Sequence, residues 1–376
     1  MHDNTNIDEF IASYRSTERI CVFTGAGVSF TQDKRYRAPG WKQLLNEILF
    51  ELLGTAERQE SETIFSELET KHVDLWDLAT AVKTYAQSKE AFLQAFRKVV
   101  LKENESADSD GRLKTRNIDG ATTLNATISF CSRIKEIRIH PCFAVNPKIE
   151  AVLTANYDPF LEAGATKKHE SSLFKPMSRP SSTFKQGQLP VYHIHGYLPF
   201  GKKKKGEDQS SKIIPLPTEP LILDRDSYEQ AYQPGSWTLC VLEHFLRKRT
   251  TLFIGFSFND EYFLRELSRL GQEPHAPVHY ALLREEDERP SGLLDEIRCA
   301  NVRPVLYAEH DQIPNLLAHS YQSVLPTTEI RIPKKDGGKK LVNPDNYWKM
   351  LWFDKRWKGK SQSLRDKKKK ETHIYT

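Results

Sequence analysis

The sequence predicts an α/β fold in which helices cover both faces of a parallel sheet. Short apolar runs that are typical of buried strands recur along the 376 residues. Stretches whose apolar residues repeat at helical spacing lie between these runs. Strands that alternate with helices favour parallel pairing, because each helix carries the chain back to the same end of the sheet.

Each predicted strand is a short run of apolar or β-branched residues. The runs lie at Ile20–Thr24, Ala151–Thr154, Val191–His195, Thr251–Ile254, Val278–Leu283 and Val302–Tyr307. The first runs directly into Gly25-Ala26-Gly27, and others end beside Asn156, Gly196 or Gly255. We therefore predict a Rossmann-like, doubly wound sheet that binds its ligand at the carboxyl ends of its strands.

The predicted helices follow from apolar residues that recur on one stripe. In Trp41–Leu53 this stripe consists of Leu44, Leu45, Ile48, Leu49 and Leu52. Further helices are expected at Ile7–Tyr14, from Phe65 through Leu75 to Val100, at Trp237–Arg249 and at Asp260–Leu270. We expect a helical insertion subdomain at about residues 41–140. Within it the polar segment Lys102–Leu124 predicts an exposed, mobile insertion, which could serve as a lid, an interface or a disordered loop.

We expect a main domain over residues 1–328 and a basic, Trp-containing C-terminal extension over residues 329–376. The net charge is +5, but residues 333–376 alone hold 14 Lys or Arg against 5 Asp or Glu. Arg331–Leu341 resembles the basic hairpin at the start of many reverse transcriptases, although no Tyr-x-Asp-Asp motif follows. A solvated tail is one interpretation, and a nucleic-acid or protein contact through its tryptophans and lysines is the other.

The cysteines and the apolar runs indicate a cytoplasmic protein without a membrane segment. Cys21, Cys131, Cys142, Cys240 and Cys299 are scattered and form no Cys-x-x-Cys pair. This spacing predicts neither a disulfide framework nor a zinc site, as in a reducing compartment. The polar N-terminus lacks the apolar core of a secretory signal, and Thr251–Phe258 is far shorter than the ~20 residues of a membrane helix.

The segment Cys21–Ser29, CVFTGAGVS, joins a strand to a tight Gly-x-Gly turn. Glycines in such a turn remove the Cβ atoms that would keep a phosphate away from backbone N–H groups. The pattern predicts nucleotide binding by Gly25, Ala26 and Gly27, with the Ser29 hydroxyl beside them. A tight corner without a ligand is the alternative, since the third glycine of the usual dinucleotide fingerprint is missing.

The segment Leu153–Glu162, LTANYDPFLE, places Asn156 and Asp158 just after a strand. Open α/β sheets bind ligands at this end of their strands. Asp158 precedes Pro159 and is equally suited to cap a helix, because proline is favoured at the first helical position. Asn156 lies before the capping position and is therefore the stronger candidate for the site.

The segment Val191–Pro199, VYHIHGYLP, contains two histidines at strand spacing. Alternation places His193 and His195 on the same face of the predicted strand. His195 comes last, before Gly196, and is the better candidate for a cleft. A hydrogen-bonded core histidine is the alternative for either residue. No third ligand lies near in sequence, so we expect no metal.

The segment Leu252–Asp260, LFIGFSFND, is a further strand that ends in Gly255-x-Ser257. It predicts another ligand-binding strand end. The alternative is an ordinary strand–loop–helix junction in which Asn259 or Asp260 caps the next helix.

Taken in order, the segments GAGVS, APGW (Ala38–Trp41), TANYD, HIHG and GFSFND resemble the motifs of the Sir2 superfamily, most closely its Sir2-like prokaryotic defence branch. The resemblance covers roughly Ile20–Tyr307. Protein deacylases of this superfamily carry a zinc module with two Cys-x-x-Cys pairs and a Gly-Ile-Pro-Asp-Phe-Arg stretch. This chain has no such pairs and carries Arg37-Ala38-Pro39-Gly40-Trp41 instead of that stretch, which argues against peptide deacylation.

The resemblance implies an enzyme that hydrolyses NAD to nicotinamide and ADP-ribose and depletes NAD in anti-phage defence. By analogy, Asn156 holds the nicotinamide ribose and the attacking water, and His195 is the general base. The residues expected to bind NAD are Gly25, Ala26, Gly27, Ser29, Asp158, Gly196, Gly255 and Ser257. We also expect a homo-oligomer or a complex with a partner defence subunit. A deacylase or ADP-ribosyl transferase, and a non-catalytic NAD or ADP-ribose sensor that regulates a partner, are the alternatives.

Overall fold

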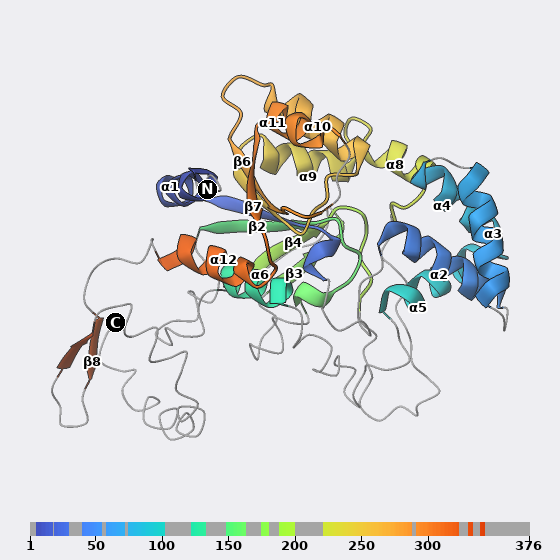
Figure 1. The fold of residues 1–376 in the computed structure, drawn as a ribbon, viewed down its shortest axis with the longest axis horizontal. Helices are drawn as coiled ribbons and strands as arrows, with labels where there is room; N and C mark the ends of the chain where they lie inside the picture. Colours follow the sequence, from blue (N-terminus) through green and yellow to red (C-terminus); the bar gives the residue numbers. More distant parts are fainter. Residues whose placement is uncertain are drawn as a thin grey trace. The chain divides into compact units, whose positions relative to one another are not determined.

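The computed structural model describes residues 5–17, 19–29, 40–54, 58–71, 74–101, 122–132, 148–162, 174–179, 188–199, 221–287, 291–322, 330–333 and 339–342. The chain divides into one compact unit over Met1–Ala318 and a second over His319–Thr376. The first unit contains a seven-stranded sheet with its helices (Figure 1). In the second, β8 (Ile330–Pro333) pairs antiparallel with β9 (Lys339–Val342). Most of the predicted polar segment Lys102–Leu124 and the tryptophans of the tail lie outside the described residues.

The sheet is parallel throughout, with the strand order β3-β4-β2-β1-β5-β6-β7. Its strands are β1 (Ile20–Thr24), β2 (Ile149–Thr154), β3 (Phe174–Met177), β4 (Leu189–His193), β5 (Thr250–Ile254), β6 (His279–Arg284) and β7 (Val302–Tyr307). The chain builds outward from β1 to one side and then returns to β5 on the other. The predicted doubly wound α/β class is therefore confirmed.

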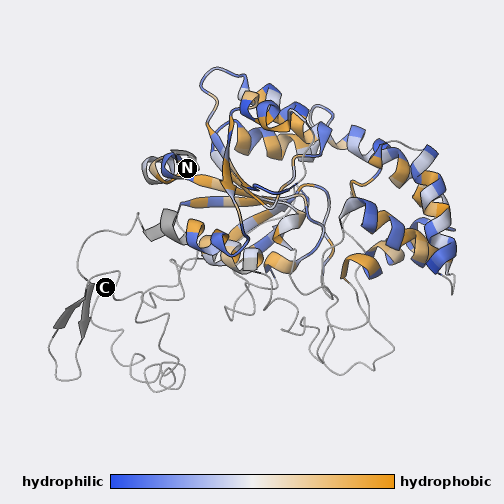
Figure 2. Cartoon of the chain, in the orientation of Figure 1, coloured by the Kyte–Doolittle hydropathy of each residue, from blue (hydrophilic) through white to orange (hydrophobic). Residues whose placement is uncertain are grey.

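Helices cover both faces of this sheet. On one face lie α8 (Arg225–Ala231), α9 (Trp237–Leu246), α10 (Glu261–Gly271) and α11 (Leu293–Cys299), and on the other lie α6 (Thr122–Ser132) and α12 (Gln312–Gln322) (Figure 1). Near β7 lies α1 (Thr5–Ser16), whose Phe10 ring is 5.2 Å from that of Tyr280. The strands are apolar along their length, whereas the helices are apolar on one side and polar on the other (Figure 2). Burial on both faces explains why the strands are continuous apolar runs.

The helical insertion forms an apolar core of its own. Its helices are α2 (Trp41–Leu53), α3 (Arg58–Lys71), α4 (Leu75–Thr84) and α5 (Lys89–Leu101). Tyr157 and Leu198, from the loops after β2 and β4, belong to the same core. The Tyr157 ring lies edge-on to Phe96 of α5 at 5.0 Å, and Arg97 donates to the carbonyl of Pro199 over 3.0 Å. The insertion therefore packs on loops that leave the carboxyl ends of the strands.

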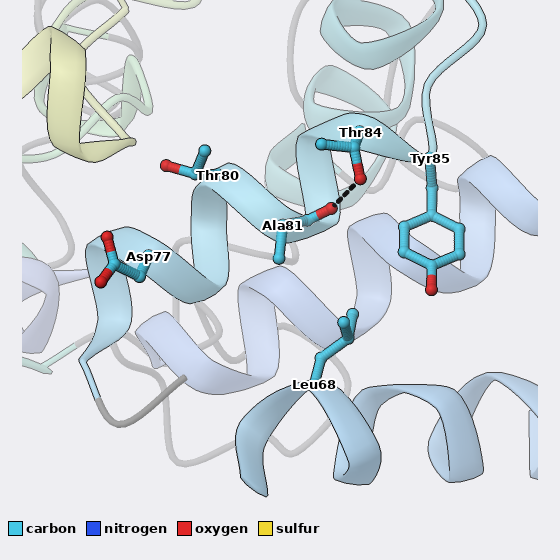
Figure 3. Close-up of a pocket in the computed structure, with 6 residues that line it drawn as sticks. All are labelled: Leu68, Asp77, Thr80, Ala81, Thr84 and Tyr85. Carbon is cyan, nitrogen blue, oxygen red and sulfur yellow. Dashed lines mark hydrogen bonds between the residues drawn. The ribbon is translucent and has the colours of Figure 1, made fainter. Parts of the chain in front are cut away.

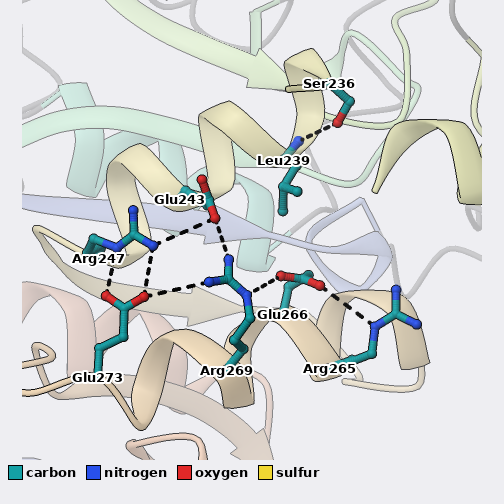
Figure 4. Close-up of polar contacts among 8 residues, drawn as sticks. All are labelled: Ser236, Leu239, Glu243, Arg247, Arg265, Glu266, Arg269 and Glu273. Atoms are coloured by element: carbon teal, nitrogen blue, oxygen red, sulfur yellow. Dashed lines mark hydrogen bonds and ion pairs between the residues drawn. The ribbon is translucent and has the colours of Figure 1, made fainter. Parts of the chain in front are cut away.

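Charged side chains connect α9 to α10. Arg247 donates two hydrogen bonds of 2.7 and 2.8 Å to Glu273, and Arg269 contacts Glu243, Glu266 and Glu273 (Figure 4). Exposed pairs of this kind stabilise a fold by up to about 1 kcal/mol each. The fully buried side chains beneath them, such as Leu267, contribute about 1.5–3 kcal/mol each. The apolar face of α10, more than its ion pairs, therefore holds that helix on the sheet.

No helix in the described part of the chain combines the length and the apolar composition needed to cross a membrane.

Candidate active site

The predicted site residues lie at the carboxyl ends of four neighbouring strands. Gly25 follows β1, Asn156 lies after β2, His195 lies after β4 and Gly255 follows β5, and these strands are adjacent in the order β4-β2-β1-β5. The strands that follow β1 in the chain, β2 to β4, lie on one side of it, whereas β5, β6 and β7 lie on the other. The strand order therefore reverses between β1 and β5. Open α/β sheets bind their ligands outside the strand ends at such a point.

The backbones of the loops after β1 and β5 lie in direct contact. Gly25 donates its N–H to Ile254 over 3.1 Å, and Gly27 donates to Gly255 over 2.8 Å. A Cβ atom on Gly25 would lie 2.5 Å from the Gly255 carbonyl oxygen, and one on Gly255 would lie 2.4 Å from the Val28 nitrogen. This contact gives the glycines a packing role, which is the tight-corner alternative left open by the sequence. Phosphate binding at this turn stays a prediction, with Ala26 as its exposed residue.

The side chain of Asn156 joins the loop after β2 to the glycine turn. Its Nδ2 donates to the Gly25 carbonyl over 2.9 Å and to Ser29 Oγ over 3.3 Å. Ser29 in turn donates to Asp158 Oδ2 over 3.0 Å. The structure thus brings together four of the predicted residues, and Asn156 also holds two loops in place.

Asp158 combines the two roles that the sequence left open. Its Oδ1 accepts the N–H of Phe160 over 3.1 Å, as a helix cap does, while Oδ2 accepts the Ser29 hydroxyl. Burial raises the pKa of Asp158 to about 6, although these two hydrogen bonds act in the opposite direction. The carboxylate therefore becomes partly protonated just below neutral pH.

The strand that leads to the two histidines ends earlier than predicted. β4 stops at His193, and Ile194 and His195 form a turn before Gly196. The turn closes because Gly196 donates its N–H back to the His193 carbonyl over 3.3 Å, with a φ of +108° that favours glycine. The expectation that both histidines continue the strand alternation is therefore wrong, and the two side chains have different surroundings.

His193 is the hydrogen-bonded core histidine. Its Nδ1 lies 3.0 Å from the Asn156 carbonyl oxygen, and its Nε2 lies 2.8 Å from Glu162 Oε1. The side chain is fully buried. His193 therefore fixes the backbone of Asn156 and has both ring nitrogens engaged.

His195 is buried with one ring nitrogen unused. Its Nε2 has no hydrogen-bond partner among the described residues and lies 3.7 Å from Asp260 Oδ2. Burial lowers the pKa of His195 to about 3, so the imidazole is neutral at pH 7. Ile222 donates its N–H to the His195 carbonyl and accepts the Tyr157 hydroxyl. The turn that carries His195 is thus tied to the loop that carries Asn156.

Further polar atoms beside His195 are buried without a partner in the described part of the chain. They are Trp41 Nε1, Tyr228 OH, Tyr232 OH and Asp260 Oδ2. The rings of Trp41, His195, Tyr228 and Tyr232 form one aromatic group with Trp76 and Tyr262, and the rings of His195 and Tyr228 are 5.2 Å apart. Buried polar atoms are nearly always hydrogen-bonded. These donors and acceptors therefore need partners that the described residues do not supply, such as ordered water or a bound polar molecule.

The loop after β5 alternates between the core and the solvent. Phe256 and Phe258 are buried, whereas Ser257 and Asn259 are exposed. Phe258 has a φ of +59°, which is unusual for a large side chain and is found where a loop is held in a strained conformation. Ser257 thus lies at the surface of this strand end, apart from the buried group around His195.

Asp260 is the residue whose place the sequence did not reveal. It caps α10 as predicted, because its Oδ1 accepts the N–H of Phe263 over 3.0 Å. Its proximity to His195 depends on the strand order β4-β2-β1-β5, which no local motif encodes. The buried hydroxyls of Tyr228 and Tyr232 were missed for the same reason.

A hollow in the helical insertion contains none of these residues. It is lined by Leu68 of α3, by Asp77, Thr80, Ala81 and Thr84 of α4, and by Tyr85 (Figure 3). Asp77 there is already paired with Arg225 over 2.6 Å. Over the residues that the structure describes, no group of three or more His, Cys, Asp or Glu side chains could hold a metal ion.

Comparison with known proteins identifies the domain. Residues 150–304 match the family model described as a SIR2-like domain, a range that includes Asn156, His195, Gly255 and Asp260. A search of curated proteins found no match. A SIR2-like domain implies NAD binding and an enzyme that uses NAD. Residues 150–304 of the chain therefore form a SIR2-like domain.

Proposed function

We propose that the chain is an NAD⁺ glycohydrolase, which cleaves NAD to nicotinamide and ADP-ribose. One observation carries the proposal: at the switch point of the sheet, Asn156 and a buried, neutral His195 lie at the ends of adjacent strands, and their loops are tied through Ile222. An amide can orient a ribose and a water molecule, and a neutral imidazole can take up a proton.

The reaction needs little acid catalysis, since nicotinamide leaves from a cationic pyridinium and the transition state resembles an oxocarbenium ion. The residues of the chain would mainly position the reacting groups and exclude bulk water. Asn156 would orient the ribose and the attacking water, and His195 would accept the proton that this water loses. The turn Gly25–Ser29 would face the pyrophosphate, and Gly255 and Ser257 would line the adenosine side.

The resemblance to defence proteins extends the proposal to the cell. NAD depletion in the cytoplasm would be the output in anti-phage defence, with activity controlled in a homo-oligomer or by a partner subunit. This extension rests on the resemblance of the motifs, and the hydrolase activity rests on the site.

The role of Asn156 is tested with Asn156→Ala and a matched control. Asn156→Ala should lower the rate of NAD hydrolysis at least 100-fold and lower the free energy of unfolding by about 1–3 kcal/mol, because two hydrogen bonds are lost. Asn301 also donates two hydrogen bonds, of 3.1 and 3.0 Å, to backbone carbonyls. It lies just before β7, at the amino ends of the strands, whereas the site lies at their carboxyl ends. Asn301→Ala should therefore lose at least as much stability and keep full activity. Equal activity in both variants would remove Asn156 from the mechanism.

A further inference from the structure

We infer that Asp260 is a positioning residue for His195: its Oδ2 accepts a hydrogen bond from Nε2–H and so leaves Nδ1 as the nitrogen that takes the proton. The catalytic part of this inference rests on the proposed function. The pairing of the two side chains rests on geometry alone and is tested separately below.

The geometry directs one oxygen of Asp260 at the imidazole. Oδ1 is held by the N–H of Phe263, so the carboxylate cannot rotate without losing the cap of α10. Oδ2 is buried, lies 3.7 Å from His195 Nε2, and neither atom has another hydrogen-bond partner among the described residues. Catalytic hydrogen bonds are often long in the free enzyme and shorten when substrate binds.

The capping role alone does not explain this arrangement, as two other aspartate caps show. Asp74 caps α4 with Oδ1, and its Oδ2 is paired with Arg225. Asp224 caps α8 with Oδ1, and its Oδ2 is paired with Lys83. In both cases a cation neutralises the second oxygen. Asp260 instead presents its second oxygen to a buried imidazole, which is the position of a carboxylate that orients a catalytic histidine.

The surroundings of the pair keep Asp260 ionised at neutral pH. Burial raises the pKa of Asp260 to about 6, and the hydrogen bond from the N–H of Phe263 favours the ionised form. The titratable groups that face the pair are Tyr157 after β2, Tyr228 and Tyr232 at α8, and Glu261 of α10. At pH 7 the carboxylate can therefore accept Nε2–H and neutralise the imidazolium that forms during turnover.

The proton and electron balance of the step is simple. His195 Nδ1 takes one proton from the water whose oxygen bonds to C1′ of the ribose. The bond between C1′ and the nicotinamide nitrogen breaks, and its electron pair leaves with neutral nicotinamide. Asp260 stabilises the imidazolium without itself becoming protonated, and His195 then releases the proton to solvent.

The test is Asp260→Asn, which keeps the cap but reverses the hydrogen bond to His195. Asparagine caps helices as well as aspartate does, so the variant should fold. Its carbonyl oxygen has to keep the N–H of Phe263, and its amide N–H₂ then faces Nε2. A donor thus replaces an acceptor, and His195 should change from the Nε2–H to the Nδ1–H tautomer. NAD hydrolysis should fall by about 10²–10⁴-fold.

Two measurements on ¹⁵N-histidine-labelled protein and its variants decide the inference. The His195 signals, assigned by their loss in His195→Gln, report the tautomer, and a product assay reports NAD hydrolysis. Asp74→Asn makes the same change at the cap of α4 and should leave both unchanged. An unchanged His195 tautomer in Asp260→Asn, or a wild-type rate of hydrolysis, would overturn the inference. If the wild-type chain hydrolyses no NAD, the proposed function fails, but the tautomer still decides whether the two side chains are paired.

Discussion

His193 and His195 lie two positions apart in the sequence, yet their side chains differ in hydrogen bonding. His193 engages both ring nitrogens, with the Asn156 carbonyl and with Glu162. His195 Nε2 has no hydrogen-bond partner in the described part of the chain. Among the described residues, Nε2 has only the 3.7 Å contact with Asp260 Oδ2, which is consistent with the catalytic role that we propose for His195.

This difference predicts that a substitution of His195 mainly lowers activity, whereas a substitution of His193 mainly lowers stability. His195→Gln should abolish NAD hydrolysis and change the free energy of unfolding by less than about 1 kcal/mol, because the 3.7 Å contact between Nε2 and Asp260 Oδ2 in the free chain is longer than a hydrogen bond. His193→Gln should lower the free energy of unfolding by about 1.5–3 kcal/mol, because glutamine cannot reach both partners. Urea unfolding and the NAD assay on both variants check this. Equal losses of stability would show that the two environments do not differ as described.

Asn156 and His195 could be predicted as site residues because each follows an apolar strand, and the end of a strand is visible as a local sequence pattern. The sequence left both roles of Asp158 open, and the structure contains the cap together with the contact to Ser29. Asp260 could be predicted only as a cap. The distance between Asp260 and His195 is set by tertiary packing across 65 sequence positions, which a single sequence does not encode.

Among the elements, the two glycine loops are the pair on which the site depends most. Gly255 has a φ of +62°, and a Cβ atom there would lie 2.4 Å from the Val28 nitrogen. Gly54, at the end of α2, has a similar φ of +60° but no atom within 4 Å of such a Cβ. The two positions share their backbone conformation and differ in the close approach of another loop.

Gly54→Ala should therefore lower the free energy of unfolding by about 1–2 kcal/mol, the cost of a left-handed conformation with a side chain. Gly255→Ala adds a clash with the loop after β1 and should lower it by about 2–5 kcal/mol in total. Denaturant unfolding of both variants measures the difference. If they lose the same amount, the loops are not in the tight contact that the site requires.

The strands show where local patterns suffice and where they do not. β1 and β7 have the predicted bounds, and β5 begins one residue earlier than predicted, because buried parallel strands are continuous apolar runs. β3 was missed because Phe174–Met177 contains Pro176, which argues against a strand in the interior of a sheet. β3 is an edge strand, where proline is tolerated. The predicted end of β4, at His195, lies two residues too late, because Ile194 and His195 of the turn continue the alternating pattern of the strand.

For the whole molecule, a buried histidine far from the site predicts how stability depends on pH. His279 accepts the N–H of Thr251 with Nδ1 over 3.2 Å and is fully buried. Burial lowers its pKa from 6.5 to about 4. Between pH 6.5 and about 4 the unfolded chain binds a proton that the folded chain excludes, so stability is greatest above pH 6.5 and falls as the pH drops through this window.

The wild-type chain should consequently lose about 2–3 kcal/mol more stability than His279→Gln when the pH is lowered from 7.5 to 4.5. Glutamine keeps an acceptor for Thr251 but does not titrate. Asp158 and Asp260, whose pKa values burial raises to about 6, act in the opposite sense, but they are present in both proteins and cancel in the comparison. Identical losses of stability in the two proteins would contradict the burial of a neutral His279.

From the proposed function we expect a water molecule, and not a peptide, to receive the ribose when the chain breaks the glycosidic bond of NAD. The direct measurement incubates the purified chain with NAD, with and without an acylated lysine peptide, and quantifies nicotinamide, ADP-ribose and acyl-ADP-ribose. We predict one nicotinamide and one ADP-ribose for each NAD consumed, at a rate that the peptide does not change. Consumption of NAD only in the presence of the peptide, with the acyl group transferred to the ribose, would contradict the account.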